Sequence, residues 1–254
     1  MIDLKQAEKD FAQYTSEFDL NDFMMKLKLR HSFRVEKYCI QIAESLEMSQ
    51  HEIEIAALIG LFHDIGRFEQ VEKYSSLNDF KTFDHAHVGV EILRQNKFLN
   101  KYLDNENEIE MVLKAIENHN KYSIDKQING IGLTFAKIIR DADKIDILDL
   151  GRYEDISKIY DIESIKNSTI TKEILEDFYK EKIIDVKEIR NGADRLVYSL
   201  GYIFDINYKE SFKILKEKNV VDNLLKISEG SIEKEKFNQI QQYIKNYINV
   251  KIRA

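Results

Sequence analysis

Proline is absent from this chain, and only nine of its 254 residues are glycine. An average protein contains roughly 5% proline, and proline is the residue that breaks α-helices most strongly. Its absence removes the commonest interruption of helical structure along the whole chain. The composition therefore favours a helical fold.

Cysteine is almost absent as well. The single Cys39 excludes an intramolecular disulfide, which fits a reducing compartment, and it has no second thiolate with which to form a soft metal site. No apolar run is long enough to cross a bilayer, and the first residues, MIDLKQAEKDF, show no signal-peptide pattern. We therefore expect a cytoplasmic protein without a membrane partner.

The net charge of −7 argues against a broad phosphate-binding surface, so duplex nucleic acid is not an expected partner. It is compatible with a small phosphorylated substrate held by a local cluster of positive charges. Hydrophobic residues make up 43% of the chain, enough for a proper core, and charged residues make up 33%. The oligomeric state is left open.

Apolar residues recur at helical three- and four-residue steps, and no useful alternating strand pattern is present. Asp22, Ser49 and Asp84 stand where helix N-caps are expected, and Ser49 with Glu52 forms a capping box. The pattern predicts helices near 23–42, 50–62, 85–93, 108–119 and 133–143, with a loop over 127–132. We expect one all-α domain over 1–254, with a core over about 22–150 and a C-terminal helical extension over 151–254.

The pair His63-Asp64 ends a strongly apolar segment, in the run LIGLFHDIGRFEQ. Burying a carboxylate beside an imidazole is costly unless a charged group lies between them. A metal ion is the simplest such group, and its remaining ligands are expected on the apolar faces of other helices.

Four more such residues are found. His31 lies on one stripe with Leu27 and Val35, because residues three and four apart share a helix face. His87 instead aligns with the polar face of its helix, and His51 is expected to be solvated. A lone histidine on an apolar face is more often a core residue than a ligand, but the combination favours a shared metal site. The candidate ligands are His31, His63, Asp64, His85, His119 and Asp143.

In this order of motifs the chain resembles the HD-domain superfamily of metal-dependent phosphohydrolases, over about 22–150. The family pattern is a histidine, the HD pair and a distal aspartate, and a subset with two metals adds two histidines between the pair and the aspartate. The segments HDIGR, HAHVG, AIENHN and RDADKID carry the match, with His85 rather than His87 in HAHVG. The resemblance implies a helical bundle with additional C-terminal helices.

The pattern is also similar to HD enzymes that hydrolyse diadenosine tetraphosphate and to diiron oxygenases on the same scaffold. The HD-GYP branch is not expected, because NKYSID follows His119 where that branch has its GYP signature. The chain also lacks the accompanying domain of the large nucleotide-signalling hydrolases.

The resemblance implies that His31, His63, Asp64 and Asp143 hold one divalent ion. Asp64 would bridge to a second ion, held also by His85 and His119. Imidazole and carboxylate ligands suit Fe, Mn, Co, Ni or Zn, so the metal's identity is open.

Arg67 follows Asp64 by three residues and could provide positive charge for a substrate phosphate, or be a solvated residue at a helix end. We therefore expect Asp64 and Arg67 to be catalytic, and Arg67 and Lys144 to bind substrate. Lys144 could instead simply pair with Asp141. Lys81, Lys121 and Arg140 are weaker candidates for the positive charge.

The expected activity is hydrolysis of a phosphoester or phosphoanhydride, in a nucleotide or another small phosphorylated compound, by metal-activated water. A diiron oxygenase would need the same six ligands, so ligand count does not separate the two. A non-catalytic metal- or nucleotide-binding sensor is the third alternative.

Overall fold

The computed structural model describes all 254 residues, and its regular structure is entirely helical. The predicted all-α class is therefore confirmed. The chain forms two compact units, Met1–Asp143 and Lys144–Ala254. The expected organisation, one domain with a core over about 22–150 and a C-terminal extension over 151–254, stays a prediction.

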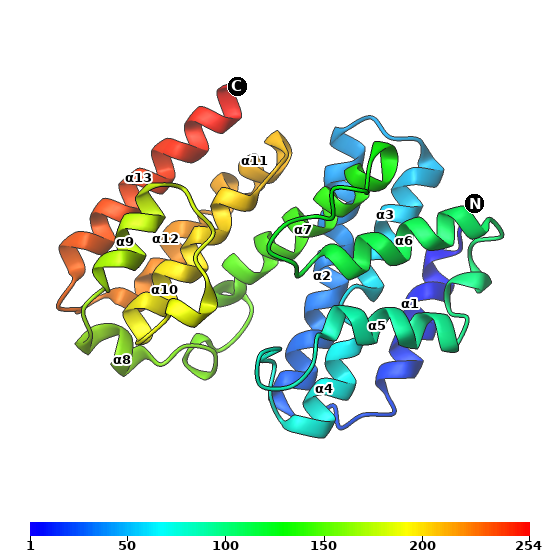
Figure 1. The fold of residues 1–254 in the computed structure, drawn as a ribbon, viewed down its shortest axis with the longest axis horizontal. Coiled ribbons are helices and arrows are strands. Elements are labelled where there is room, and N and C mark those ends of the chain that lie inside the picture. Colours follow the sequence, from blue (N-terminus) through cyan, green and yellow to red (C-terminus); the bar gives the residue numbers. More distant parts are fainter. The chain divides into compact units, whose positions relative to one another are not determined.

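The first unit contains the helices that carry all the candidate metal ligands, drawn from blue to green in Figure 1. Helix α3 contacts α1, α2 and α6, while α5 contacts α4 and α6. The elements are α1 (Leu4–Thr15), α2 (Phe23–Ser45), α3 (Gln50–Phe62), α4 (Gly66–Tyr74), α5 (His85–Gln95), the 3-10 turn η1 (Leu99–Lys101), α6 (Glu106–Asn118) and α7 (Gly130–Leu148), which continues into the second unit.

The predicted N-caps are confirmed. Asp22 accepts hydrogen bonds from two backbone N–H groups of α2, and Asp84 does the same for α5. Ser49 and Glu52 form the capping box of α3. Such caps satisfy the N–H groups that a helix leaves unpaired in its first turn, so they determine where a helix begins.

Two predicted boundaries differ from the structure. Helix α6 begins at Glu106 rather than near residue 108, because the side chain of Asn105 caps it by accepting from the N–H of Asn107. Helix α7 begins at Gly130, inside the segment expected to be a loop. No prediction covered α1, whose buried Phe11 packs edge-on against Phe62 of α3.

Helices α2 and α3 approach unusually closely at Gly60. A Cβ atom on this glycine would lie 2.8 Å from the Cα of Glu36 and 2.9 Å from the Sγ of Cys39, both in α2. The missing side chain therefore lets the two backbones pack together. This contact brings the end of α3, with the HD pair, alongside α2.

The second unit consists of short helices around the long α13. Helix α10 contacts α8 and α9, and α13 contacts α11 and α12. Phe178, Phe204 and Tyr243 form an aromatic cluster with ring centroids 5.0–6.5 Å apart. The elements are η2 (Leu150–Arg152), η3 (Ile156–Lys158), α8 (Ile162–Asn167), α9 (Lys172–Tyr179), η4 (Val186–Glu188), α10 (Gly192–Gly201), η5 (Tyr202–Asp205), α11 (Lys209–Glu217), α12 (Val220–Leu225), η6 (Lys226–Ser228) and α13 (Lys234–Arg253).

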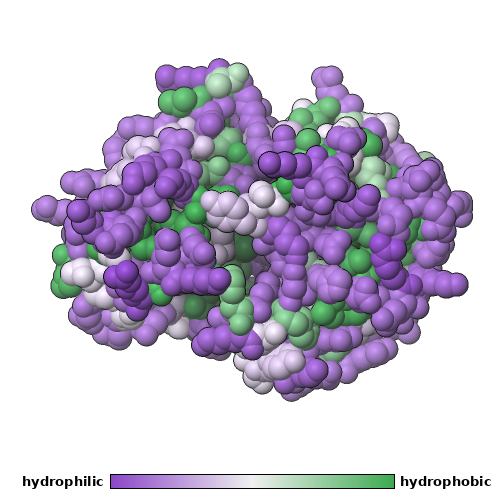
Figure 2. All heavy atoms as spheres, in the orientation of Figure 1, coloured by the Kyte–Doolittle hydropathy of each residue, from purple (hydrophilic) through white to green (hydrophobic).

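Hydrophilic residues cover most of the face shown in Figure 2, and hydrophobic residues form separate small patches on it. None of the helices combines the length and the apolar character needed to span a membrane.

Candidate metal centre

The first unit brings all six predicted ligands together from five helices. His63 caps the C-terminus of α3 and His119 that of α6, while His85 is the first residue of α5. Asp64 lies in the short turn between α3 and α4. The four histidines and Asp64 are at most 2% exposed, and the Asp143 side chain is 13% exposed.

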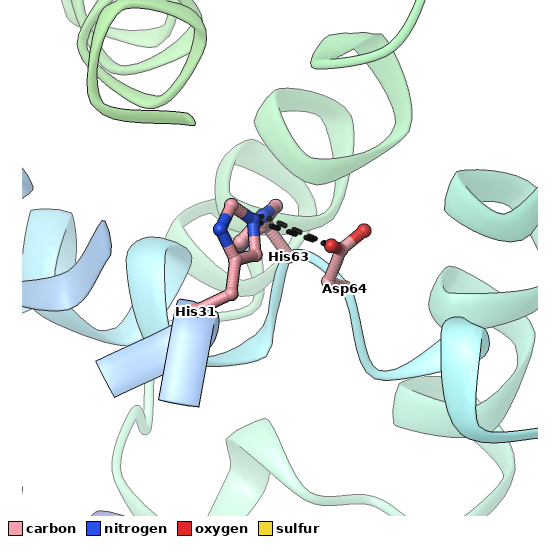
Figure 3. Close-up of side chains that lie close together, drawn as sticks. All are labelled: His31, His63 and Asp64. Atoms are coloured by element: carbon pink, nitrogen blue, oxygen red, sulfur yellow. Dashed lines mark hydrogen bonds and ion pairs between the residues drawn. The ribbon is translucent and has the colours of Figure 1, made fainter. Parts of the chain in front are cut away.

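Three helices supply a first group of ligand atoms. The Nε2 atoms of His31 and His63 lie 3.2 Å apart, and Oδ2 of Asp64 lies 3.4 and 3.6 Å from them. Figure 3 shows how the two rings and the carboxylate point toward one another. Asp143 Oδ1 approaches the same two nitrogens, at 3.1 Å from His31 and 3.7 Å from His63.

A second group lies on the other side of Asp64. The Nε2 atoms of His85 and His119 are 3.0 Å apart, and Oδ1 of Asp64 lies 3.1 and 3.7 Å from them. The two oxygens of Asp64 therefore face different pairs of histidines. A carboxylate in this position can bridge two cations.

The outer nitrogens of three histidine rings face oxygen acceptors. The Nδ1–H of His63 donates to the carbonyl of Gly60 at 2.8 Å, and that of His119 to the carbonyl of Ile116 at 2.6 Å. His85 Nδ1 lies 2.7 Å from the carboxylate of Asp79. Such bonds place the proton of a neutral imidazole on Nδ1 and leave a lone pair on Nε2, as in histidine ligands of metals.

Burial lowers the pKa of His119 to about 4, so this ring is neutral at pH 7. Its Nε2 lone pair faces Nε2 of His85 across 3.0 Å in the second group. A cation placed between these two nitrogens could be bound by both rings.

Asp64 supports the same conclusion. Its Oδ1 atom is buried and accepts no hydrogen bond, which is costly for an ionised oxygen. Burial raises the pKa of Asp64, but the charge of Lys28 and the neighbouring histidines together outweigh burial, and the pKa lies well below the usual range. An ionised carboxylate that is buried among four imidazoles, with no hydrogen-bond donor at Oδ1, fits bound divalent ions.

Arg67 is not a solvated residue at a helix end. Its Nη1 atom donates to Gln70 Oε1 at 2.7 Å, to the Leu77 carbonyl at 2.8 Å and to Asp79 Oδ1 at 2.6 Å. Its Nε atom is buried without a hydrogen-bond partner and lies 3.4 Å from Asp64 Oδ1. Arg67 thus faces the centre while holding the loop after α4, and its roles in catalysis and substrate binding stay predictions.

Lys28 is a residue of the centre that the sequence reasoning missed. Its Nζ lies 2.6 Å from Asp64 Oδ2, and its side chain is only 12% exposed. Lys28 precedes His31 by three residues and so shares its helix face. This three-residue spacing from a candidate ligand is the sequence feature that could have identified Lys28. Asp79, also missed, lies in an aperiodic loop that offers no such signal.

Three of the other cationic candidates have structural partners. Lys144 Nζ bonds to Asp205 in the second unit at 2.8 Å, an acceptor that the sequence did not suggest, and its role in substrate binding stays a prediction. Lys121 bonds to Asp84. Arg140 is buried and donates to the carbonyls of Asn118, His119 and Lys121, so it stabilises the end of α6 that carries a ligand.

The residues expected to lie outside the centre do so. The side chain of His87 is 60% exposed and lies 3.2 Å from Glu117. That of His51 is 47% exposed, beside Glu108. Cys39 is buried as a free thiol, whose pKa burial raises well above its usual value.

Residues 29–148 match the family model described as HD domain, a range that includes all six candidate ligands. An HD domain therefore spans residues 29–148, in agreement with the histidine and aspartate groups of the structure. Most of the superfamily are hydrolases. Comparison with curated proteins found no match, and neither did comparison with solved structures.

Proposed function

We propose that this protein is a metal-dependent phosphohydrolase with a dinuclear centre. Its substrate is a phosphoester or phosphoanhydride of a nucleotide or of another small phosphorylated compound. His31, His63, Asp64 and Asp143 would hold one divalent ion, and Asp64, His85 and His119 the other. Divalent ions in such a centre lower the pKa of bound water and neutralise charge on phosphoryl oxygens.

One observation carries the proposal. The oxygens of Asp64 face two separate histidine pairs, at 3.4 and 3.6 Å on one side and at 3.1 and 3.7 Å on the other. Six ligands exceed what one open catalytic ion requires, because such an ion typically takes about three protein ligands and keeps a position for water. The number of ligands therefore fits two ions better than one.

The chain's own contribution is the positioning of these ligands and of positive charge. Carbonyl and carboxylate acceptors fix the orientation of three imidazole rings. Lys28 lies next to Oδ2 of Asp64, and Arg67 lies near Oδ1. Two cationic groups therefore reach a buried position beside the ligands. Positive charge placed there would stabilise the charge that develops on a phosphoryl group during hydrolysis.

A screen of phosphorylated compounds tests the proposal, with the metal-free full-length protein reconstituted with Mn²⁺, Fe²⁺, Co²⁺, Ni²⁺ or Zn²⁺. Elemental analysis of the same samples gives the metal content. We expect release of inorganic phosphate or of a phosphorylated product with at least one metal, and its loss on chelation. A protein that binds no metal would contradict the proposal.

Oxygen uptake separates this function from that of a diiron oxygenase, which needs the same ligands. The iron-loaded protein should hydrolyse phosphorylated compounds without consuming oxygen. Oxygen consumption without hydrolysis would support the oxygenase instead. Two bound ions with neither activity would support a sensor.

A further inference from the structure

Asp79 joins the candidate metal centre to the loop between α4 and α5. Its Oδ2 accepts from His85 Nδ1 at 2.7 Å and from Asn120 Nδ2 at 3.2 Å. Its Oδ1 accepts from Arg67 Nη1 at 2.6 Å and from Gln70 Nε2 at 2.9 Å. All four donors belong to the first unit, and both oxygens of the carboxylate are fully used.

His85 differs from the other two oriented histidines in its position on the helix. His63 and His119 follow the last turns of their helices, and each donates to a carbonyl three residues earlier in its own turn. His85 begins α5, so no helical turn precedes it. It therefore needs an acceptor from elsewhere in the fold, and Asp79 supplies one.

The acceptor has a chemical consequence for the second ligand group. A carboxylate on Nδ1–H keeps the proton on that nitrogen, so Nε2 presents its lone pair to Asp64 and His119. It also increases the basicity of the ligating nitrogen, which strengthens a metal bond. The carbonyl acceptors of His63 and His119 are neutral, so among these three histidines only His85 has a charged acceptor.

The side chains around Asp79 hold its carboxylate in place. Arg67 brings a positive charge to Oδ1, with its Nη1 at 2.6 Å. Gln70, which is fully buried, also donates to the side chain of Thr82 and the carbonyl of Phe83 in the same loop. The carboxylate thus has a rigid support on both sides.

We propose that Asp79 is a positioning residue for the second metal ion, acting through His85 by fixing the tautomer and orientation of its ring. The inference rests on the proposed dinuclear centre. It also implies that the loop between α4 and α5 must be ordered for this ion to bind tightly.

The test uses the full-length protein and Mn²⁺ alone. Equilibrium binding measures the affinity of each ion, and long-range ¹H–¹⁵N NMR of the metal-free protein reports the tautomer of each histidine. In Asp79→Ala, affinity for one of two ions should fall roughly 10–100-fold, and affinity for the other should be unchanged. The His85 ring should lose its uniform Nδ1–H signature, while the signatures of His63 and His119 persist.

The chain offers a matched control, because His87 on the same helix has its Nδ1 3.2 Å from Glu117, at the surface. Glu117→Gln should leave both affinities unchanged. Asp79→Glu should recover part of the lost affinity. If Asp79→Ala loosens the fold, Asp79→Asn keeps the volume, removes the charge, and should still weaken one ion.

The outcomes separate this inference from the proposed function. Two ions bound to Asp79→Ala and to Asp79→Asn with wild-type affinities, or an unchanged His85 tautomer in both variants, would overturn the role of Asp79. A wild-type protein that binds one ion or none would overturn the dinuclear centre itself. The NMR signature of His85 in the metal-free protein would then still test the contact.

Discussion

Gly66 lies against the backbone of His85, and a Cβ atom on this glycine would stand 2.3 Å from the His85 carbonyl oxygen. The same atom would lie 2.7 Å from the backbone nitrogen of Gly89, so both contacts are with backbone and neither can move aside alone. The close packing of α4 on α5 is therefore what sets the position of His85 relative to Asp64.

Gly66→Ala should displace α5 and with it one ligand of the second group. Overpacking of this kind costs about 1–3 kcal/mol of stability, and affinity for one of two metal ions should also fall. Urea unfolding and Mn²⁺ titration measure the two effects. Gly132→Ala is the control, because its Cβ would meet only side chains, of Met111 at 3.5 Å and of Ile128 at 3.7 Å, which are ordinary contact distances. Equal effects of both variants would show that the α4–α5 contact is not specific.

The metal stoichiometry of the loaded protein should be two ions per chain. His119→Ala should bind one ion, because the second group then retains only His85 and one oxygen of Asp64. His87→Ala should still bind two, since its side chain is 60% exposed and points to Glu117. Elemental analysis after anaerobic reconstitution gives the counts. One ion in the wild type, unaffected by His119→Ala, would reject the dinuclear model.

Asp64→Asn should be the most damaging conservative change in the chain. It preserves the shape of the side chain but removes the charge shared between the two ligand groups. Turnover should fall at least about a thousandfold, roughly 4 kcal/mol of barrier, and metal content should fall with it. Asp104→Asn, an exposed change, should have no effect on either. Wild-type turnover in Asp64→Asn would show that the HD pair is structural.

Lys28→Met separates substrate binding from metal binding. If its ammonium group neutralises a substrate phosphate, turnover should fall about tenfold or more, which is at least about 1.4 kcal/mol of barrier. The protein should still hold two ions, because Lys28 donates no lone pair. Lys26→Met, an exposed neighbour on the same helix, is the control. Loss of metal in Lys28→Met, or normal kinetics, would contradict this role.

Glu36 should make stability depend on pH. Burial and the nearby charge of Glu8 raise its pKa to about 8, whereas an unfolded glutamate titrates near 4.5. Between these values only the folded state keeps the proton, so this residue's contribution to stability is full below about pH 4.5 and declines as pH rises toward 8. Glu36→Gln should therefore stabilise the protein at pH 7.5, by on the order of 2 kcal/mol, and change little at pH 4.5.

Urea unfolding of the metal-free protein at both pH values checks this expectation. Glu44→Gln, at an exposed position of α2, serves as the control. A Glu36→Gln variant that is no more stable than wild type at pH 7.5 would show that the buried carboxyl group costs nothing.

Much of the fold and of the candidate site follows from local sequence pattern. Caps such as Asp22 and Asp84 act within one helical turn, so they are readable without knowing the rest of the fold. The three- and four-residue spacing separated buried His85 from exposed His87, because a helix presents positions two apart on different faces. Where capping depends on a weaker signal, as at Asn105, the predicted boundary was less accurate.

The charges that surround these ligands depend on tertiary packing. Lys28 and Asp64 are 36 residues apart, and their 2.6 Å contact depends on how α2 packs against the end of α3. Asp79 lies in a loop without periodicity. Its contacts with His85, Arg67 and Gln70 form only when the chain folds, and no local spacing in the sequence predicts them. The helices and the inner-face ligands can be predicted from the sequence, because both depend on neighbours within a turn. The protonation and orientation of those ligands depend on side chains from other elements, which only the folded chain brings into contact.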